Sequence, residues 1–472
     1  MSNVKKNFIY SIIQNIIISI LPIITAPYVS RVLLADNIGI YSYTRTVAYC
    51  FSLISMIGIN NYGNRTIAKV RDDKEKLSKT FFEIYLVQII CSSLSILFYI
   101  LYLAFFVTNY QQIAFIQSIY LLSYFFSIEW FFQGLEKFKI SSLVSIISKI
   151  MSTIFIFVFV KNPDDLWIYV LIVASFSFIE KALLILFLNK EIFLVKIKFS
   201  DIKKHIKPCL ILFIPVISVG IYKQMDKLML GILSSVTEVG YYEQAEKIIS
   251  IPGTIITTFG LVMLPKISYL IEKNNKELIS HYTKKVVTFT MFCIFPVVFG
   301  LIAISNDLII VFLGNDFIKV ATLINWLSGS MLFISFASVI RRQYLLPFEK
   351  DKIFIQSVMA GAIFNFLLNL VLIPKYSSVG TCISTLLAEF LVMLIQTMYA
   401  KKALPILDYF WSIFPFLYKS FIMFLIVLFV KNLNLSLVPK IFFQIIVGMF
   451  VYFLLNRKFI LSLLSEKMKK KL

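Results

Sequence analysis

Residues Leu86–Phe106 read LVQIICSSLSILFYILYLAFF, a run of 21 residues without a charged side chain. As an α-helix, such a run extends about 31 Å, which matches the hydrocarbon thickness of a bilayer. Similar apolar runs follow one another along all 472 residues, of which 59% are hydrophobic and only 15% charged. The alternation over about 10 residues that is typical of membrane β-strands does not occur. The sequence therefore predicts an all-α integral membrane protein.

Apolar windows and polar breaks divide the chain into about fourteen predicted transmembrane helices. Lys5 and Lys6 precede the first, which is too long for a secretory signal core and has no small-residue cleavage site. We expect it to stay uncleaved and to be interrupted at Pro22 and Pro27. The predicted spans are 8–28, 40–60, 80–106, 112–134, 141–160, 166–188, 209–233, 242–264, 285–305, 319–340, 353–374, 380–400, 411–430 and 438–456.

The basic residues predict the orientation of these spans. With the N-terminus inside, the cytoplasmic segments hold 33 of the 46 Lys and Arg, and the outer loops hold six. The positive-inside rule therefore places both termini in the cytoplasm. The basic residues that give the net charge of +21 are distributed over the loops and are not clustered on one soluble face. This distribution argues against a nucleic-acid partner and for contact with anionic membrane lipid.

A weak internal repeat indicates two related halves. GIYSYTR at Gly39–Arg45 resembles GYYEQAEK at Gly240–Lys247, an offset of 201 residues. An even number of spans in each unit gives both copies the same orientation, as in one class of secondary transporter. We expect a six-helix bundle at 1–195 and a second at 196–405, joined by the basic stretch 189–208. Residues 406–472 then add two helices and a basic cytoplasmic tail.

Several charges fall inside predicted spans. GIYKQMDKLMLG at Gly220–Gly231 carries Lys223, Asp226 and Lys227 on one helical face, and one carboxylate cannot neutralise two ammonium groups. A basic side chain at mid-bilayer costs about 2.5–3.5 kcal/mol, so it must face protein or water. With Arg45 and Lys247, these lysines predict a cationic cavity for an anionic head group.

The intramembrane acids leave two interpretations open. They are candidates for binding a coupling H+ or Na+, or they form plain ion pairs such as Glu243 with Lys247 or Asp226 with Lys223. The candidate ion-coupling residues are Asp226, Glu129, Glu243, Glu246 and Glu389. Asn15, Asn365 and Asn369 either line a polar cleft or serve helix packing. Glu83 and Lys181 lie near span ends, where we expect them to reach the interface.

Signals for catalysis or metal binding are missing. The five cysteines have no paired spacing, and both histidines, His205 and His281, lie in predicted loops. The chain contains no GxxxxGK[ST] loop and no catalytic grouping in an outer loop. We therefore expect a protein that is not an enzyme and that needs no metal or cofactor.

The stretch LPIITAPYVSRVLLADNIGIYSYTRTVAYCFSLISMIGINNYGNRTIAKVRDDKEKLSKTF, residues 21–81, resembles the opening of a known family. This family is the Wzx-type polysaccharide-biosynthesis flippases of the multidrug/oligosaccharidyl-lipid/polysaccharide (MOP) exporter superfamily, whose relatives include MATE transporters. The most specific positions are Pro27, residues 30–33, Gly39, Gly58 and Arg65. GIYKQMDKLMLGILSSVTEVGYYEQAEKI, residues 220–248, is similar to the family's seventh and eighth spans.

This resemblance implies a MATE-like fold of two six-helix bundles around a cavity that opens alternately to each side. The implied substrate is an undecaprenyl-pyrophosphate-linked oligosaccharide, moved across the bacterial cytoplasmic membrane for capsule or O-antigen-like synthesis. Arg45, Lys223, Lys227 and Lys247 are the implied substrate-binding cations. H+ or Na+ is the implied coupling ion, and polysaccharide polymerase machinery is an implied partner. Many such flippases have twelve spans, so the role of the last two helices stays open.

Three alternative functions remain. A cation-coupled MATE-type drug exporter would favour an acidic, aromatic cavity, whereas the predicted cavity is basic. A lipid II flippase of the MviN/MurJ type differs in that its loss would stop growth. A membrane polysaccharide polymerase is disfavoured by the short outer loops, which leave little room to hold sugars.

Overall fold

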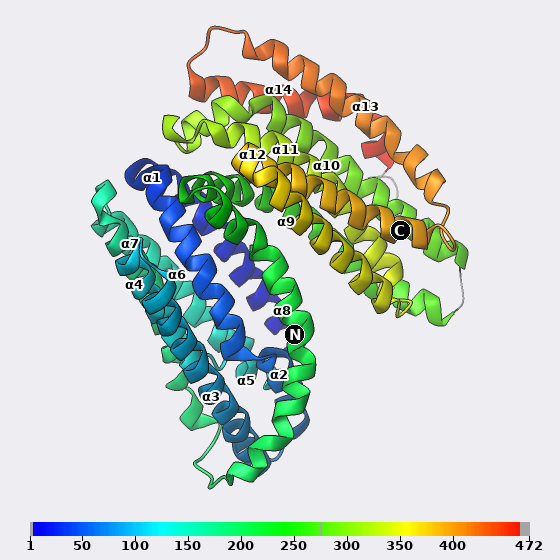
Figure 1. Cartoon of the computed structure of the whole chain (residues 1–472). Coiled ribbons are helices and arrows are strands. Elements are labelled where there is room, and N and C mark those ends of the chain that lie inside the picture. The colour runs from blue at the N-terminus through cyan, green and yellow to red at the C-terminus, as the bar shows by residue number, and fades with distance from the viewer. Residues whose placement is uncertain (1–2, 274–275, 463–472) are drawn as a thin grey trace. The chain divides into compact units, whose positions relative to one another are not determined.

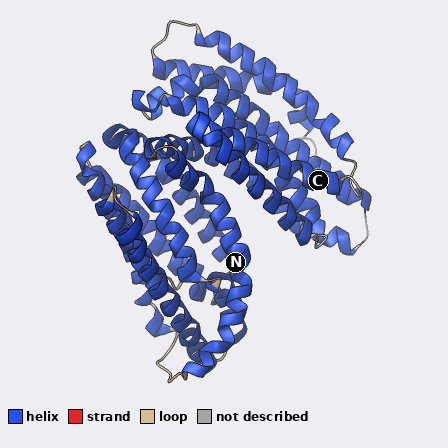
Figure 2. Cartoon of the chain, in the orientation of Figure 1, coloured by secondary structure: helices blue, strands red, loops and turns tan. Residues whose placement is uncertain are grey.

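Helices make up all of the regular secondary structure in the described part of the chain. The computed structural model describes residues 3–273 and 276–462, where helices are joined by short loops (Figure 2). The all-α fold predicted from the apolar runs is therefore confirmed. The end of the predicted basic tail, KMKKKL at residues 467–472, lies outside the described residues.

The helices follow the predicted spans. α1 (Asn3–Met56) and α12 (Asp351–Ala400) each contain two predicted spans, separated by non-helical geometry at Leu34 and Ser377. Counted over the described residues, ten helices are long and apolar enough to cross a membrane, or eleven with the bent α8. Since α1 and α12 are double, this set corresponds to thirteen spans; α9, which is not in the set, covers the remaining predicted span, so the structure is consistent with fourteen. The other spans lie in α3 (Lys74–Phe106), α4 (Gln111–Leu122) with α5 (Glu129–Gly134), α6 (Phe138–Phe159), α7 (Leu166–Ile185), α8 (Phe199–Leu233), α9 (Val236–Glu272), α10 (Lys276–Phe312), α11 (Lys319–Ile340), α13 (Ile406–Lys431) and α14 (Leu437–Leu455).

The break in α1 lies in the gap between the first two predicted spans, 8–28 and 40–60, and not at the prolines. Helical geometry continues through Pro22 and Pro27 and is lost only at Leu34, whose φ of 65° is left-handed. The expected interruption at the prolines was therefore wrong. The chain reverses at a residue with a Cβ atom, a conformation that costs about 1–3 kcal/mol and requires support from the surrounding packing.

The predicted linker is partly helical. α8 begins at Phe199, so His205 lies in a helix and is only 3% exposed. His281 lies in α10. The placement of both histidines in loops was therefore wrong. Glu83 is 1% exposed and contacts His205, so the expectation that it reaches the interface was also wrong.

Contacts divide the chain into two compact units, residues 1–240 and 241–472, called the first and second unit below (Figure 1). In the first unit, α1 packs against α3, α4, α6 and α8, and α7 packs against α4 and α6. A short amphipathic helix that the sequence did not predict, α2 (Ile59–Val70), packs against α3, α5 and α8. Because α8 packs against helices of the first unit, the boundary between the two units lies after α8, at residue 240. The division after residue 195, which rests on the repeat, stays a prediction.

Two glycines that the predicted repeat relates lie in contact within the first unit. A Cβ atom on Gly39 would lie 1.9 Å from the carbonyl oxygen of Val236, and one on Gly240 would lie 2.5 Å from that of Ala35. Val236 and Gly240 follow Ala35 and Gly39 by the same 201 residues. The start of α9 therefore crosses α1 in a nearly reciprocal way that excludes any side chain at either glycine.

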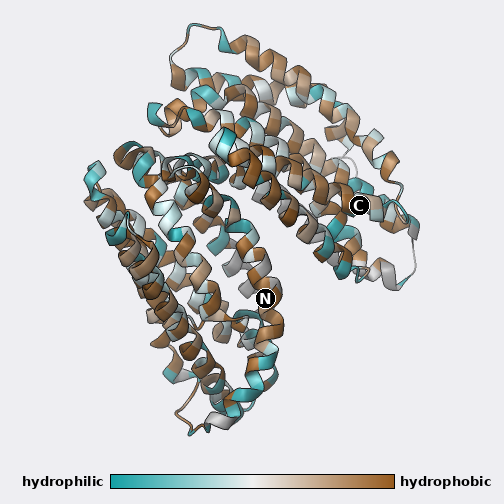
Figure 3. Ribbon diagram, viewed as in Figure 1, coloured by the Kyte–Doolittle hydropathy of each residue, from teal (hydrophilic) through white to brown (hydrophobic). Residues whose placement is uncertain are grey.

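The second unit contains most of α9 and all of α10 to α14. α10 packs against α11, α13 and α14, and α11 packs against α12. Hydrophobic residues make up much of the helices in both units (Figure 3), and many large hydrophobic side chains are exposed. On α13, Trp411 and Phe429 are 73% and 76% exposed. Such an apolar surface is stable only against lipid.

Candidate functional site

The guanidinium of Arg45 lies inside the first unit. Its carbon is 3.2 Å from the centre of the Tyr120 ring, which α4 places beside the second half of α1. Over the described residues, the buried Nη1 atom of Arg45 has no hydrogen-bond partner. The side-chain nitrogen of Gln117, one turn before Tyr120, is likewise buried and unpaired within the described structure. The Arg45 guanidinium and the Gln117 amide are thus buried, and each has a hydrogen-bond donor that is not used within the described structure.

A break in the fourth predicted span positions Tyr120 and its neighbours. α4 ends at Leu122, a 3₁₀ turn covers Ser123–Phe126, and α5 resumes at Glu129. The backbone carbonyls that the break releases must find donors inside the membrane. Gln88 of α3 supplies them: its Nε2 donates to the carbonyls of Tyr124 (2.7 Å) and Ser127 (3.1 Å), and its Oε1 accepts from the Trp130 indole.

Lys181 of α7 reaches the same break. Its Nζ donates to the Ser123 hydroxyl at 2.8 Å and lies 3.5 Å from the centre of the Tyr124 ring. Tyr120 and Tyr124 are joined through their hydroxyls at 2.6 Å, so Arg45 and Lys181 contact one aromatic pair. Lys181 therefore points into the bundle, and the expectation that it reaches the interface was wrong.

Two acids and a third base complete this group. Lys149 of α6 pairs with Glu180 of α7 at 3.8 Å, and Glu129 lies within electrostatic range of Glu180, Lys181 and Lys149. Three basic and two acidic side chains leave one positive charge in excess when all are ionised. We call Arg45, Tyr120, Ser123, Tyr124 and Lys181, with Glu129, Lys149 and Glu180, the Arg45 site.

The other predicted cations lie elsewhere. On α8, Lys223 is exposed and Lys227 is buried, with 8% exposure. α8 runs beside the Arg45 helix, where the Thr46 hydroxyl donates to the Gln224 side chain at 3.4 Å. Lys247 belongs to the second unit and pairs with Glu243 at 3.0 Å, one of the two ion pairs that the sequence left open. A single cavity shared by all four cations stays a prediction.

The remaining candidate residues are distributed over several helices. Buried Asn365 and Asn369 of α12 bond to each other at 3.1 Å. Glu389 of α12 lies in electrostatic range of Arg341. Asp226 on α8, Glu246 on α9 and exposed Asn15 on α1 each interact with other groups. Among the described residues, no cluster of His, Cys, Asp and Glu is arranged to hold a metal ion.

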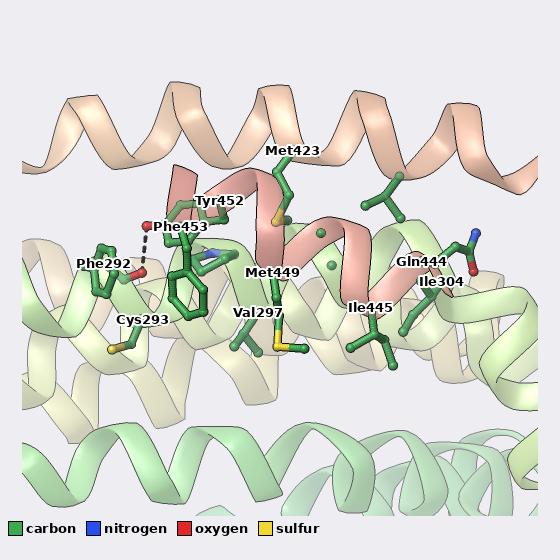
Figure 4. A pocket seen from close by; sticks show the side chains of 14 residues that line it. Phe292, Cys293, Val297, Ile304, Met423, Gln444, Ile445, Met449, Tyr452 and Phe453 are labelled. Atoms are coloured by element: carbon green, nitrogen blue, oxygen red, sulfur yellow. Dashed lines mark hydrogen bonds between the residues drawn. The ribbon is translucent and has the colours of Figure 1, made fainter. Parts of the chain in front are cut away.

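An apolar pocket of about 380 Å³ lies in the second unit between α10, α13 and α14 (Figure 4). Gly300 and Gly448 help to open it, and Tyr452 closes one part by donating to the Phe292 carbonyl at 2.8 Å. The amide side chain of Gln444 lies in its wall with 1% exposure, and neither amide atom has a hydrogen-bond partner in the described chain. The pocket therefore suits an apolar chain.

Residues 4–271, more than half of the chain, match the family described as polysaccharide biosynthesis protein. The chain belongs to this family. A putative O-antigen transporter of Shigella dysenteriae is 23% identical over 395 residues, covering 83% of this chain and 98% of that protein. A putative O-antigen transporter of Escherichia coli (strain K12) is 22% identical over 407 residues, covering 85% and 97%.

Two solved structures share the fold of this family member. A lipid II flippase MurJ in an inward closed conformation aligns with a TM-score of 0.70 and 19% identity, covering 97% of this chain and all of that one. An inward-facing MATE family transporter of the MOP superfamily aligns with a TM-score of 0.59 and 10% identity, covering 81% and 97%. The predicted MATE-like fold is confirmed, and the protein is a multi-pass membrane protein.

Sequence reasoning missed part of the Arg45 site. Lys181 was assigned to a span end, and Tyr120, Tyr124 and Gln88 were not singled out. A signal was present, since spans four, five and six each carry charge: Glu129, Lys149, Glu180 and Lys181. Charges on three consecutive spans of one bundle tend to pair with each other, because lipid cannot solvate them.

Proposed function

We propose that this protein is a flippase for a lipid-linked oligosaccharide repeat unit, joined to undecaprenyl through pyrophosphate. It moves the unit across the bacterial cytoplasmic membrane by alternating access, in the synthesis of a capsule or O-antigen-like polysaccharide. Membership of the polysaccharide biosynthesis family and the names of the two O-antigen transporters support this proposal. Both termini lie in the cytoplasm in this scheme, as the distribution of Lys and Arg favours.

The observation that carries the proposal is the state of Arg45. Its guanidinium packs on Tyr120, while a buried donor, Nη1, has no hydrogen-bond partner among the described residues. Leaving such a donor unmet is costly, and for a charged group the cost exceeds about 1–3 kcal/mol. A ligand that brings hydrogen-bond acceptors and negative charge therefore stabilises the Arg45 site.

A pyrophosphate meets these needs. It presents several oxygen acceptors and negative charge, and bonds from a guanidinium to phosphate oxygen are about twice as strong as neutral hydrogen bonds. Lys181 lies across the Tyr120–Tyr124 pair and supplies a second cation, held by Ser123 until a stronger acceptor arrives. Glu129 and Glu180 limit the excess to one positive charge, which favours release over permanent capture.

The lipid part of the substrate needs an apolar path. The pocket between α10, α13 and α14 is lined almost entirely by apolar side chains, and its volume of about 380 Å³ accommodates a few isoprene units. We assign the last two helices to holding part of the isoprenoid chain during transport. Burial of each isoprene unit from water contributes about 0.8 kcal/mol per carbon, but transfer from lipid contributes much less, so the pocket guides the chain and does not trap it.

We propose that an ion gradient drives the transport. H+ or Na+ is the coupling ion, and Glu129 is the candidate acid that lies in the Arg45 site. Asp226, Glu243, Glu246 and Glu389 remain candidates from the sequence. The protein delivers its product to the polymerase machinery on the outer side of the membrane.

Deleting the gene in its source organism tests the proposal. We expect the deletion strain to lose its surface polysaccharide and to accumulate the lipid-linked unit, measured by mass spectrometry of lipid extracts. When synthesis of the repeat unit is blocked in the same strain, we expect it to grow normally. Wild type should restore the polysaccharide, Arg45→Gln should not, and Lys69→Gln, which removes an exposed cation, should restore it.

The result also separates the alternatives. Growth arrest with accumulation of lipid II, regardless of surface polysaccharide, would assign the chain to the lipid II flippases, whose fold it shares. Unchanged polysaccharide together with greater sensitivity to cationic drugs would identify a drug exporter. Either outcome would refute the proposed substrate.

A further inference from the structure

A second group of titratable residues lies where α2, α3 and α8 meet, with Glu83 and His205 buried and Lys204 and Lys79 about half exposed. Both Lys204 and His205 of α8 bond to the same Glu83 oxygen, Oε2, at 2.8 and 2.9 Å. The other imidazole nitrogen, Nδ1, lies 2.7 Å from the Tyr62 hydroxyl of α2. We call these four residues, with Lys79 and Asp201, the Glu83 cluster. It joins three helices through the two ring nitrogens of one histidine.

The contacts of His205 fit a neutral ring. A neutral imidazole has one donor and one acceptor nitrogen. Nε2 faces a carboxylate, which only accepts, so the proton is assigned to Nε2. Nδ1 then accepts from the Tyr62 hydroxyl. Both nitrogens are satisfied, and no further proton fits without reversing the Tyr62 hydroxyl.

The charges of the cluster are balanced in this state. Lys79 lies 3.3 Å from Asp201 and 4.0 Å from the second Glu83 oxygen, Oε1. Two lysines thus face two carboxylates while His205 and Tyr62 are neutral, and Cys209 lies nearby on α8. Within the described chain, buried Oε1 of Glu83 has no hydrogen-bond partner. This oxygen can accept a proton although it is buried in the contact between the helices.

The cluster fastens one particular segment. α8 consists of two pieces, Asp201–Ile214 and Val219–Leu233, bent by 54°. The first piece also packs closely at Gly58, where a Cβ atom would lie 2.6 Å from the Cys209 carbonyl oxygen. A small apolar cavity of about 90 Å³ lies beside it. The polar cluster is thus the directional attachment of the first piece of α8 to α2 and α3.

We propose that the Glu83 cluster is a proton-binding site that clamps the first piece of α8 when empty and releases it when a proton binds. A proton on Nδ1 of His205 turns the Tyr62 contact from acceptor to donor and places a third cation among Lys79 and Lys204. A proton on Glu83 removes the charge that holds both lysines. Both routes add one proton, break no covalent bond and loosen the same contact, so acidification opens the clamp.

Hydrogen exchange of the full-length protein in lipid nanodiscs measures the clamp. Exchange of residues 199–214 is followed from pH 8 to pH 5.5 and corrected for the intrinsic rate of the amides. Linkage to one proton allows at most about a tenfold change per pH unit. We expect protection of this segment to fall by roughly tenfold or more over the range, with peptides from α14 unchanged.

Matched variants separate a proton site from a structural contact. Glu83→Gln should lower protection at pH 8 and reduce the pH response to below about twofold, whereas Glu83→Asp should retain a response. Tyr62→Phe should shift the midpoint, because Nδ1 loses its donor. Asp73→Asn removes a carboxylate from an exposed pair with Lys76 and should behave as wild type.

The protonation state of His205 is directly measurable. The chain has two histidines, and His281 is exposed, so His281→Gln leaves one imidazole for nitrogen-15 magnetic resonance. We expect a neutral ring at pH 8 with the proton on Nε2, and a change of state over the range in which the clamp opens. An equal pH response in Glu83→Gln, no response in wild type, or greater protection at acid pH would overturn the proposal.

Discussion

Replacing Arg45 by glutamine tests the central electrostatic argument. The substitution removes the cation that packs on Tyr120 and whose Nη1 is unpaired within the described structure. Hydrogen bonds to charged groups contribute about 1.5–3 kcal/mol, so losing one to a pyrophosphate should weaken binding by about 10- to 150-fold. Arg45→Lys keeps the charge but loses the planar fork, and a smaller loss is expected.

The same substitution should not damage the fold. Arg45 brings the one positive charge in excess at its site, and removing an uncompensated buried charge is neutral or stabilising. Against this stands the lost cation–π contact, which is worth about 2 kcal/mol when desolvated. The two effects are similar in size, so the melting temperature should change by a few degrees at most. Function and stability are therefore expected to separate.

Binding of undecaprenyl diphosphate to the purified protein, measured by native mass spectrometry in matched micelles, gives the affinity. Thermal unfolding of the same samples gives the stability, and Lys69→Gln controls for the loss of one surface charge. Affinity of Arg45→Gln within twofold of wild type would refute the assignment of this cation to the pyrophosphate. A collapse of the melting temperature would instead show that Arg45 acts mainly through Tyr120 in the fold.

Other predictions concern packing. Gly39→Ala should lower the melting temperature by several degrees or prevent folding, because its Cβ atom would lie 1.9 Å from the Val236 carbonyl oxygen. Gly300→Ala should be neutral or stabilising by up to about 1 kcal/mol, since no described atom lies within 4 Å of the new carbon. Gly300→Leu should fill the α10–α13–α14 pocket and reduce binding of a long isoprenoid alcohol in the same mass-spectrometric assay, with the melting temperature kept. Gln88→Leu should cost about 2–4 kcal/mol in thermal unfolding, because the carbonyls at the break between α4 and α5 lose their donor.

Hydropathy predicted the spans well because each must satisfy its backbone internally over a fixed thickness. The same argument located the two spans within α1 and the two within α12, which are separated by non-helical residues at Leu34 and Ser377. It placed the break at Leu34 in the gap between spans 8–28 and 40–60. The prolines of α1 do not end the helix, because neighbouring helices compensate for the lost bonds. Hydropathy missed the amphipathic helix α2, which is too polar to register as a span.

The candidate site was harder to predict because its contacts are far apart in sequence. Spacing placed Lys223, Asp226 and Lys227 on one face, and it paired Glu243 with Lys247 correctly as one alternative. Arg45 and Tyr120 are 75 residues apart, and their contact depends on how each helix is rotated about its axis. The distance of a residue from a span end likewise does not show which way its side chain points. Lys181 and Glu83 were therefore placed at the interface instead of inside the bundle.

The reciprocal contact of Gly39 and Gly240 has a consequence for how such a chain can change over generations. The two glycines occupy equivalent positions in the predicted repeat and contact each other, so neither can compensate for a change at the other. A larger residue at one glycine cannot be relieved by a smaller one at the second, because glycine already has no side chain to give up. Sequence drift in the two copies should therefore stall at this pair while the rest of the repeat diverges beyond recognition.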